Sequence, residues 1–121
     1  MKPLSNYDIL ARCKDLPNFM GVFMRDKLPK GLTKGCGVLN LDDSSGSGTH
    51  WCGWFKDLYF DSYGFPPPEE FLDKAKSVRY NDLDIQKIYD PPWCGHLCLA
   101  FLHHMASGRD FESFAMKVYR V

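Results

Sequence analysis

Aromatic and apolar residues crowd positions 49–65 on both sides of the dipeptide Lys56-Asp57. Two such runs separated by two polar residues are typical of a β-hairpin. We therefore predict two strands joined by a tight loop at Lys56-Asp57, in a register that places Phe55 opposite Leu58. Lys-Asp is not one of the dipeptides that favour a type I′ turn, so this register is a hypothesis.

The register brings two titratable side chains, His50 and Asp61, to one face of the hairpin, and it places position 63 opposite His50. Diagonal neighbours in a ladder have Cα atoms roughly 7–8 Å apart, so a carboxylate can reach an imidazole nitrogen. A histidine held by an aspartate is a candidate general base. A polar pair on the surface of an antiparallel sheet has the same pattern, and this stretch alone leaves both interpretations open.

Shorter helices and strands are predicted on both sides of the hairpin by apolar spacing and by capping residues. The predicted helices cover residues 6–14, 68–76, 94–107 and 110–117, and the predicted extended segments cover 19–24, 37–41, 78–80 and 83–88. We place segment 37–41 beside the hairpin. Residues 42–48, DDSSGSG, form a flexible polar stretch that suits a loop bordering a site, although an ordinary surface turn has the same composition.

The composition is that of one globular domain spanning residues 1–121. Lys plus Arg and Asp plus Glu both number 15, so the formal net charge is zero, which argues against a protein that mainly binds phosphate backbones. No apolar run approaches the roughly 18–20 residues of a membrane span, and we expect a soluble protein without a secretion signal. The 5 cysteines, an odd number, fit a reducing compartment better than a disulfide framework.

Cys94 is the cysteine best placed for chemistry, because it begins a predicted helix with a buried apolar stripe. A thiol in the first turn of a helix feels unpaired N–H groups and the positive end of the helix dipole, which favour the thiolate. Gln86 comes eight positions earlier on a predicted strand. Its side-chain amide could donate to a developing oxyanion alongside the Cys94 backbone N–H. An isolated glutamine commonly faces solvent, but its occurrence together with His50, Asp61 and Cys94 favours a catalytic role.

Four motifs follow one another in the order His, Asp, Gln, Cys: His50-Trp51, Tyr59-Phe60-Asp61-Ser62-Tyr63-Gly64-Phe65, Gln86 and Cys94-Gly95-His96-Leu97-Cys98-Leu99. This order resembles the signature of the adenovirus-protease and Ulp1-like cysteine peptidases (clan CE). Residues 4–9 and 21–29 also resemble the viral and Polinton-type capsid maturation proteases of that group. The resemblance implies an α+β, papain-like or adenain-like fold, in which a small mixed, mainly antiparallel sheet packs on a central helix headed by the catalytic cysteine.

The resemblance further implies that the chain is a thiol endopeptidase that needs no cofactor. By analogy Cys94 attacks the scissile carbonyl and His50 takes and returns the proton. Asp61 then orients His50, and Gln86 stabilises the oxyanion.

Members of this group commonly cut after small residues, often a Gly-Gly pair, in capsid precursors or in ubiquitin-like proteins. We expect Trp51 and Trp93 to wall a narrow cleft, with plain core packing as the alternative for each. The expected partner is a polypeptide substrate, and the need for an activating peptide stays open. The zero net charge gives no support for nucleic acid as an activator. The expected location is intracellular, in the host cytoplasm or nucleus or packaged in a virion.

Other functions compete with a capsid maturation protease. One is a deubiquitinase or deSUMOylase-like peptidase, and another is a protease-like module that binds a polypeptide tail without cutting it. A metal site is the third, with candidate ligands at Cys94, His96, Cys98, His103, His104, His50 and Cys52. Zinc needs a closed tetrahedral set of ligands, whereas the cysteines of this cluster lie on the apolar face of a predicted helix, so we predict no metal site.

Overall fold

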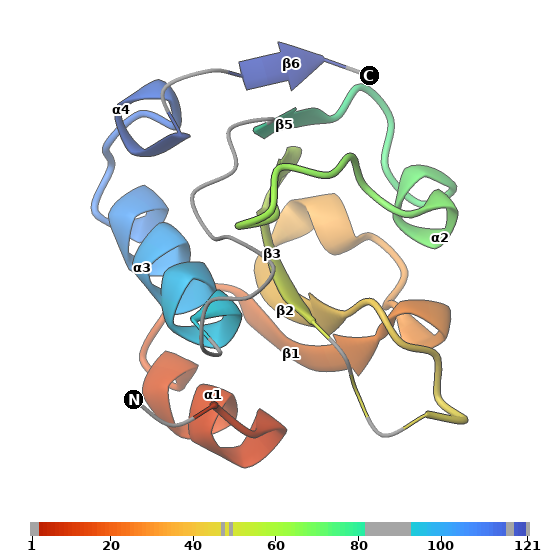
Figure 1. Cartoon of the computed structure of the whole chain (residues 1–121). Coiled ribbons are helices and arrows are strands. Elements are labelled where there is room, and N and C mark those ends of the chain that lie inside the picture. Colours follow the sequence, from red (N-terminus) through yellow and green to blue (C-terminus); the bar gives the residue numbers. More distant parts are fainter. Residues whose placement is uncertain (1–2, 47, 49, 82–92, 116–117, 121) are drawn as a thin grey trace.

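The structure, a computed structural model, describes residues 3–46, 48, 50–81, 93–115 and 118–120 (Figure 1). Within these residues, six strands form one sheet, in the order in which they occur along the chain. The strands are β1 (Phe19–Met24), β2 (Cys36–Asn40), β3 (Trp51–Phe55), β4 (Leu58–Phe60), β5 (Arg79–Asn81) and β6 (Val118–Arg120). The helices are α1 (Asn6–Cys13), α2 (Glu69–Leu72), α3 (Cys94–Ala106) and α4 (Glu112–Ala115), with 3₁₀ turns η1 (Arg25–Lys27) and η2 (Leu32–Lys34).

The sheet is mixed. β1 pairs with β2 and β4 with β5 in parallel, whereas the β2–β3, β3–β4 and β5–β6 pairs are antiparallel. Most of the pairings are therefore antiparallel, and helices accompany the sheet without a regular strand–helix alternation. The predicted α+β class, with a mixed and mainly antiparallel sheet, is confirmed.

The central hairpin has the predicted loop and register. Phe55 pairs with Leu58 across Lys56-Asp57, and the antiparallel ladder extends from there between β3 and β4. Lys56 adopts a left-handed φ of 57°, as the first position of a tight hairpin turn requires. β2 lies against the other edge of β3, as predicted for residues 37–41.

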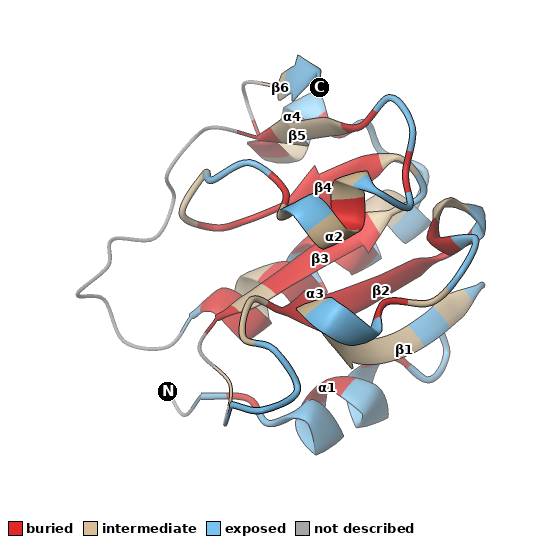
Figure 2. Ribbon diagram, turned by 90° about the vertical axis from the view of Figure 1, so that its right-hand side faces the viewer, coloured by how far each residue is buried: buried red, intermediate tan, exposed pale blue. Residues whose placement is uncertain are grey.

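Helices and loops cover both faces of the sheet, so the core has two parts (Figure 2). On one face, α1, α3 and α4 pack against the sheet, and on the other face α2, η2 and the segment after α2 do so. The alternation of side chains along β4 explains this division, because Leu58 and Phe60 enter the first part and Tyr59 enters the second. The central strands are consequently buried on both sides.

The larger part of the core is built on α3, which begins at Cys94 as predicted. Phe101 on this helix is fully buried. Its ring stacks on Phe60 with centroids 5.2 Å apart and meets the ring of Phe111 edge-on at 5.5 Å. Gly53 on β3 allows the close approach, because a Cβ there would lie 3.2 Å from the Phe101 ring. The position of α3 against β3 is thus set by aromatic packing.

Helix α2 is shorter than the predicted helix over residues 68–76 and ends at Leu72. The chain leaves the helix because Ala75 and Val78 must enter the core on the second face of the sheet. Ser77 takes a left-handed φ of 56° between them, which turns the chain toward β5. Packing therefore overrides the helical periodicity of this segment.

At the amino end, α1 matches its prediction and carries a capping box. The Ser5 hydroxyl accepts a hydrogen bond from the Asp8 N–H, and the Asp8 carboxylate accepts one from the Ser5 N–H. At the carboxyl end, the helix predicted over residues 110–117 is confined to α4, and the chain then enters β6. The extended segment predicted over 83–88 lies outside the described residues.

No helix in the described ranges combines the length and the apolar character that crossing a bilayer would require.

Replacing Phe101 by Ala is expected to lower the free energy of unfolding by about 3–5 kcal/mol, because it leaves a cavity beside the rings of Phe60 and Phe111. His103 lies on the same helix but is exposed, so His103→Ala should change the free energy of unfolding by less than about 0.5 kcal/mol. Urea denaturation of both variants measures the difference. Equal stability of the two variants would contradict this account of how α3 is anchored.

Candidate active site

Three predicted site residues meet at one end of the central hairpin. His50 directly precedes β3, Asp61 directly follows β4, and Cys94 is the first residue of α3. Because β3 and β4 are antiparallel, the start of one strand lies beside the end of the other. α3 packs against β3 and brings its first turn to the same end.

His50 and Asp61 form a buried hydrogen-bonded pair. The Nε2 atom of His50 lies 2.7 Å from the Oδ1 atom of Asp61, and the side chains are 9% and 0% exposed. A contact this short between buried groups fixes the imidazole ring and favours its charged form. It also leaves Nδ1 as the ring nitrogen available to Cys94.

Tyr63 and Asn81 hold this pair in place. The Tyr63 backbone N–H donates to Asp61 Oδ1 at 2.8 Å, and the Tyr63 ring stacks on His50 with centroids 4.3 Å apart and planes 13° from parallel. The Asn81 side chain accepts from the Asp61 N–H at 3.0 Å and donates to the Asp61 carbonyl oxygen at 2.7 Å. The orientation of the aspartate is therefore determined by backbone contacts as well as by its partner.

Sequence reasoning did not assign either of these supporting residues to the site. A signal for Tyr63 was present, because the hairpin register places position 63 opposite His50. The amino-acid sequence contained no such signal for Asn81, since this residue belongs to a strand that reaches Asp61 only through the parallel pairing of β4 with β5.

The Cys94 thiol is surrounded by groups that favour a negative charge. Burial alone raises the pKa of this thiol, but hydrogen bonding to His50 and to the backbone N–H of Trp51 and Gly95 outweighs burial and lowers the pKa below its ordinary value. The Trp51 N–H lies 3.5 Å from Sγ. The start of a 13-residue helix adds its dipole to these contacts.

His50 is shifted in the complementary direction. Burial alone lowers the pKa of the imidazole, but its hydrogen bonds to Asp61 and Cys94 raise the pKa to about 9. A raised pKa on the base and a lowered pKa on the thiol both favour a thiolate–imidazolium pair near neutral pH. The arrangement can therefore supply a nucleophile and a proton donor at adjacent positions.

The other four cysteines lack this environment, and all five are free thiols. Burial raises the pKa of Cys13 and Cys36 to about 11, and it raises the pKa of Cys52 and Cys98 well above the ordinary range. These groups are protonated at neutral pH. Cys94 is the one cysteine whose surroundings lower the pKa.

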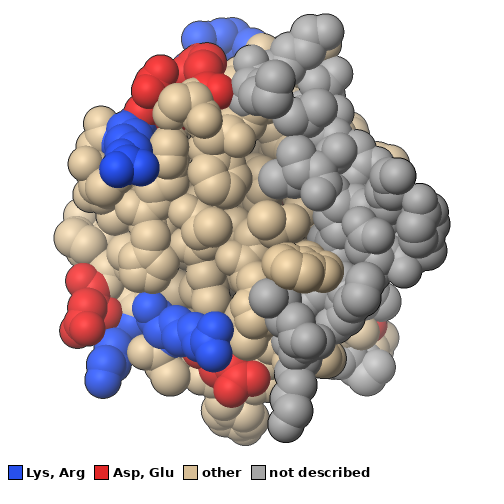
Figure 3. Space-filling view, turned by 60° about the vertical axis from the view of Figure 1, so that its left-hand side comes forward, with Lys and Arg blue, Asp and Glu red and all other residues tan. Residues whose placement is uncertain are grey.

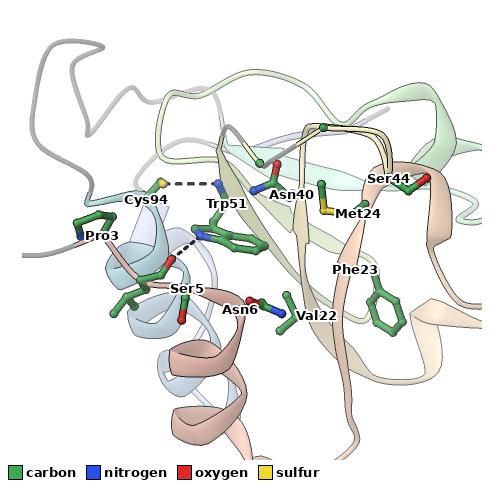
Figure 4. Close-up of a pocket in the computed structure, with 13 residues that line it drawn as sticks. Pro3, Ser5, Asn6, Val22, Phe23, Met24, Asn40, Ser44, Trp51 and Cys94 are labelled. Carbon is green, nitrogen blue, oxygen red and sulfur yellow. Dashed lines mark hydrogen bonds between the residues drawn. The ribbon is translucent and has the colours of Figure 1, made fainter.

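A cleft of about 550 Å³ opens beside Cys94 (Figure 4). Its walls come from the N-terminal segment, β1, the end of β2, the loop after β2 and the start of β3, so Ser44, Gly46 and Gly48 of the predicted loop line the cleft. The Trp51 indole N–H donates to the Leu4 carbonyl oxygen at 3.0 Å and ties the N-terminal segment to the cleft. The lining residues carry no charged side chain: Pro3, Leu4, Ser5, Asn6, Val22, Phe23, Met24, Asn40, Ser44, Gly46, Gly48, Trp51 and Cys94.

The remaining predicted site residues have different positions. Trp51 lines the cleft, whereas Trp93 is 41% exposed directly before α3 and is not among the lining residues. The substrate-binding role of both tryptophans stays a prediction. Gln86 lies outside the described residues.

The metal-binding alternative can be examined at His50, Cys52 and Asp61, whose ligand atoms lie within 4.8 Å of one another. Ligands of a tetrahedral zinc ion with bonds of about 2.0–2.1 Å are roughly 3.3 Å apart. The nitrogen–oxygen distance of 2.7 Å between His50 and Asp61 is that of a hydrogen bond instead. A zinc ion would need the two side chains to separate, so their present arrangement is that of a hydrogen-bonded pair.

Replacing Asn81 by Ala is expected to lower the free energy of unfolding by about 1–3 kcal/mol, because both backbone groups of Asp61 lose their buried partner. The Asp61 amide should also exchange with deuterium faster than in the unmodified chain. Tyr80→Phe, on the same strand, is a control that should leave both measurements unchanged. Unaltered protection of the Asp61 amide in Asn81→Ala would contradict the role assigned to Asn81.

No family model and no curated protein sequence matches this chain.

Proposed function

We propose that this chain is a cysteine endopeptidase in which Cys94 is the nucleophile, His50 the general base and acid, and Asp61 the residue that orients the imidazole. One observation carries the proposal: a thiol with a lowered pKa at the start of α3 interacts with a histidine whose pKa is raised by a buried carboxylate. A thiolate–imidazolium pair of this kind is suited to acyl transfer. A histidine that only stabilised the fold through Asp61 would give no reason for the additional contact with Cys94.

The proposed reaction proceeds through an acyl-enzyme. The Cys94 thiolate forms a bond to the scissile carbonyl carbon, and an electron pair of the carbonyl moves to the oxygen. When the C–N bond breaks, the His50 imidazolium gives its proton to the leaving nitrogen. Neutral His50 then takes a proton from the water that attacks the thioester, which releases Cys94 as the thiolate. The Cys94 backbone N–H and the Gln86 amide are the proposed donors to the oxyanion.

The proposed substrate is a polypeptide that presents an uncharged segment to the cleft. Charged side chains of a substrate would lose water there without finding an opposite charge among the lining residues. On the face drawn in Figure 3, basic and acidic side chains are intermixed around an uncharged centre. That distribution does not favour a nucleic acid at this face.

The finer identity rests on the motif resemblance described above. By that resemblance, the chain has a papain-like arrangement and matures capsid precursor proteins of a virus or transposon, with cleavage after small residues such as Gly-Gly. A deubiquitinase or deSUMOylase-like activity uses the same machinery on a ubiquitin-like tail. The five free thiols support an intracellular location, in the host cytoplasm or nucleus or within the virion. An activating peptide is a further proposed partner.

The experiment that tests the proposed function measures alkylation of each cysteine by iodoacetamide at pH 6.5, followed by peptide mass spectrometry. Cys94 is expected to react at least about tenfold faster than each of the other four, because it alone has a substantial thiolate fraction at this pH. His50→Ala should remove most of the difference, because the imidazole makes the largest contribution that lowers the Cys94 pKa. Equal reactivity of all five thiols in the unmodified chain would leave a non-catalytic binding module as the better interpretation.

Turnover distinguishes the two enzymatic substrate classes. Peptides containing Gly-Gly should be cleaved by the unmodified chain, and Cys94→Ala with an unchanged fold should show no cleavage. Faster cleavage of intact ubiquitin-like precursors than of such peptides would favour the deconjugating activity. Cleavage by Cys94→Ala at the unmodified rate would place the nucleophile elsewhere.

The pH profile of turnover should follow the two shifted groups. Activity should rise as the Cys94 thiolate forms, at a pH below the ordinary thiol value of about 8.5, and fall as pH rises through about 9, where His50 loses its proton. Asp61→Asn removes the carboxylate that raises the His50 pKa, so the loss of activity at high pH should move from about 9 toward about 6.5. The rate should also fall by about a hundredfold or more. An upper limb that stays near 9 in Asp61→Asn would contradict the assignment.

A further inference from the structure

Cys52 is a buried thiol beside the His50–Asp61 pair, and the proposed reaction does not use it. Cys52 is the second residue of β3 and lies two residues after His50, so the two-residue period of extended backbone directs both side chains to the same face. The ladder pairs Gly53 with Phe60, and the next step along the same register brings Cys52 opposite Asp61. The Cys52 sulfur, the His50 nitrogen and an Asp61 oxygen all lie within 4.8 Å of one another.

Two polar atoms next to this thiol lack an ordinary hydrogen-bond partner. Among the described residues, Asp61 Oδ2 and the Tyr59 hydroxyl are the buried side-chain atoms for which no such partner is found. Both residues are fully buried, and both interact electrostatically with the Cys52 thiol. A buried carboxylate oxygen without a donor is costly, so a donor within reach has a strong reason to turn toward it.

The Cys52 thiol is able to be that donor. Burial raises its pKa well above the ordinary value, and the charge of Asp61 raises it further, so the S–H proton is present at neutral pH. A thiol is a weak donor and a weak acceptor at once. It can therefore donate to a carboxylate while it accepts from a phenol, and Tyr59 lies on the same face of the hairpin as Cys52.

We propose that Cys52 is a positioning residue for Asp61, donating its S–H to Oδ2 while its sulfur accepts the O–H of Tyr59. A series of hydrogen bonds through Tyr59, Cys52, Asp61 and His50 would then connect the core on the second face of the sheet to the Cys94 thiol. The inference rests on the proposed function, because its consequence is the orientation of the base that activates Cys94. It assigns to a buried thiol a role that neither Cys13 nor Cys98 has.

The test compares Cys52→Ala with Cys52→Ser by the rate at which iodoacetamide alkylates Cys94 at pH 6.5. If Cys52 acts as a donor, Cys52→Ser should react within about threefold of the unmodified chain, and Cys52→Ala about tenfold more slowly. Packing alone predicts the opposite order, because a hydroxyl in an apolar environment is less well tolerated than a methyl group. Cys13→Ala removes a buried thiol remote from the pair and should leave the rate unchanged.

A second variant keeps the inference testable if Cys52→Ala does not fold. Tyr59→Phe removes only the hydroxyl that donates to the Cys52 sulfur in the proposed series of hydrogen bonds. This variant should slow Cys94 alkylation by about twofold to threefold. The proton NMR resonance of the His50 ring N–H, which reports the hydrogen bond to Asp61, should shift in both Tyr59→Phe and Cys52→Ala.

The outcomes separate this inference from the proposed function. The donor role is supported if Cys94 of the unmodified chain is alkylated fast, if Cys94 reacts faster in Cys52→Ser than in Cys52→Ala, and if the His50 resonance shifts. Fast alkylation of Cys94 in the unmodified chain, but a faster reaction in Cys52→Ala than in Cys52→Ser, overturns the role of Cys52. The same holds if neither the rate nor the resonance changes in any variant. Both outcomes leave the peptidase proposal intact. A Cys94 that reacts like the other thiols in the unmodified chain overturns both.

Discussion

The candidate site depends on one interaction, the hydrogen bond of 2.7 Å between His50 and Asp61 at the end of the central hairpin. A carboxylate that is completely buried is stable only if its charge is compensated, and the raised pKa of His50 favours an imidazolium as the compensating group. The same contact raises the proton affinity of His50 and thereby favours the Cys94 thiolate. The orientation of the His50 ring and the lowered pKa of the Cys94 thiol consequently have a common origin.

The architecture around this contact is built to hold it rigidly. Asn81 approaches from β5 and binds the backbone of Asp61 on both sides, while Tyr63 covers the imidazole ring. On the opposite face of the sheet, the packing of Phe101 against Phe60 positions α3, and with it the thiol at its first residue. Contacts from β5, from Tyr63 and from α3 restrict the side-chain positions of His50, Asp61 and Cys94 more than the His50–Asp61 hydrogen bond alone would.

The cleft beside Cys94 shows how a small chain can place two titratable groups next to an uncharged cleft. Cys94 and His50 lie at the junction of α3 and β3, whereas the cleft walls are apolar or uncharged. Trp51 belongs to both regions, since its backbone N–H contacts the sulfur and its indole closes against Leu4. The Cys94 thiol and the cleft wall are therefore connected through Trp51, the first residue of β3.

The sequence by itself determined the hairpin register, the start of α3 and the residue types that meet at the site. The proximity of His50 to Asp61 follows from the two-residue period of strands, and the position of Cys94 follows from helical spacing, so both are local properties of the chain. Only the tertiary structure decided the early end of α2, because the competing demand came from Ala75 and Val78 in a core assembled from distant segments. It also decided that Asn81 clamps Asp61 and that Cys94 reaches His50, since these contacts join elements that no local pattern connects.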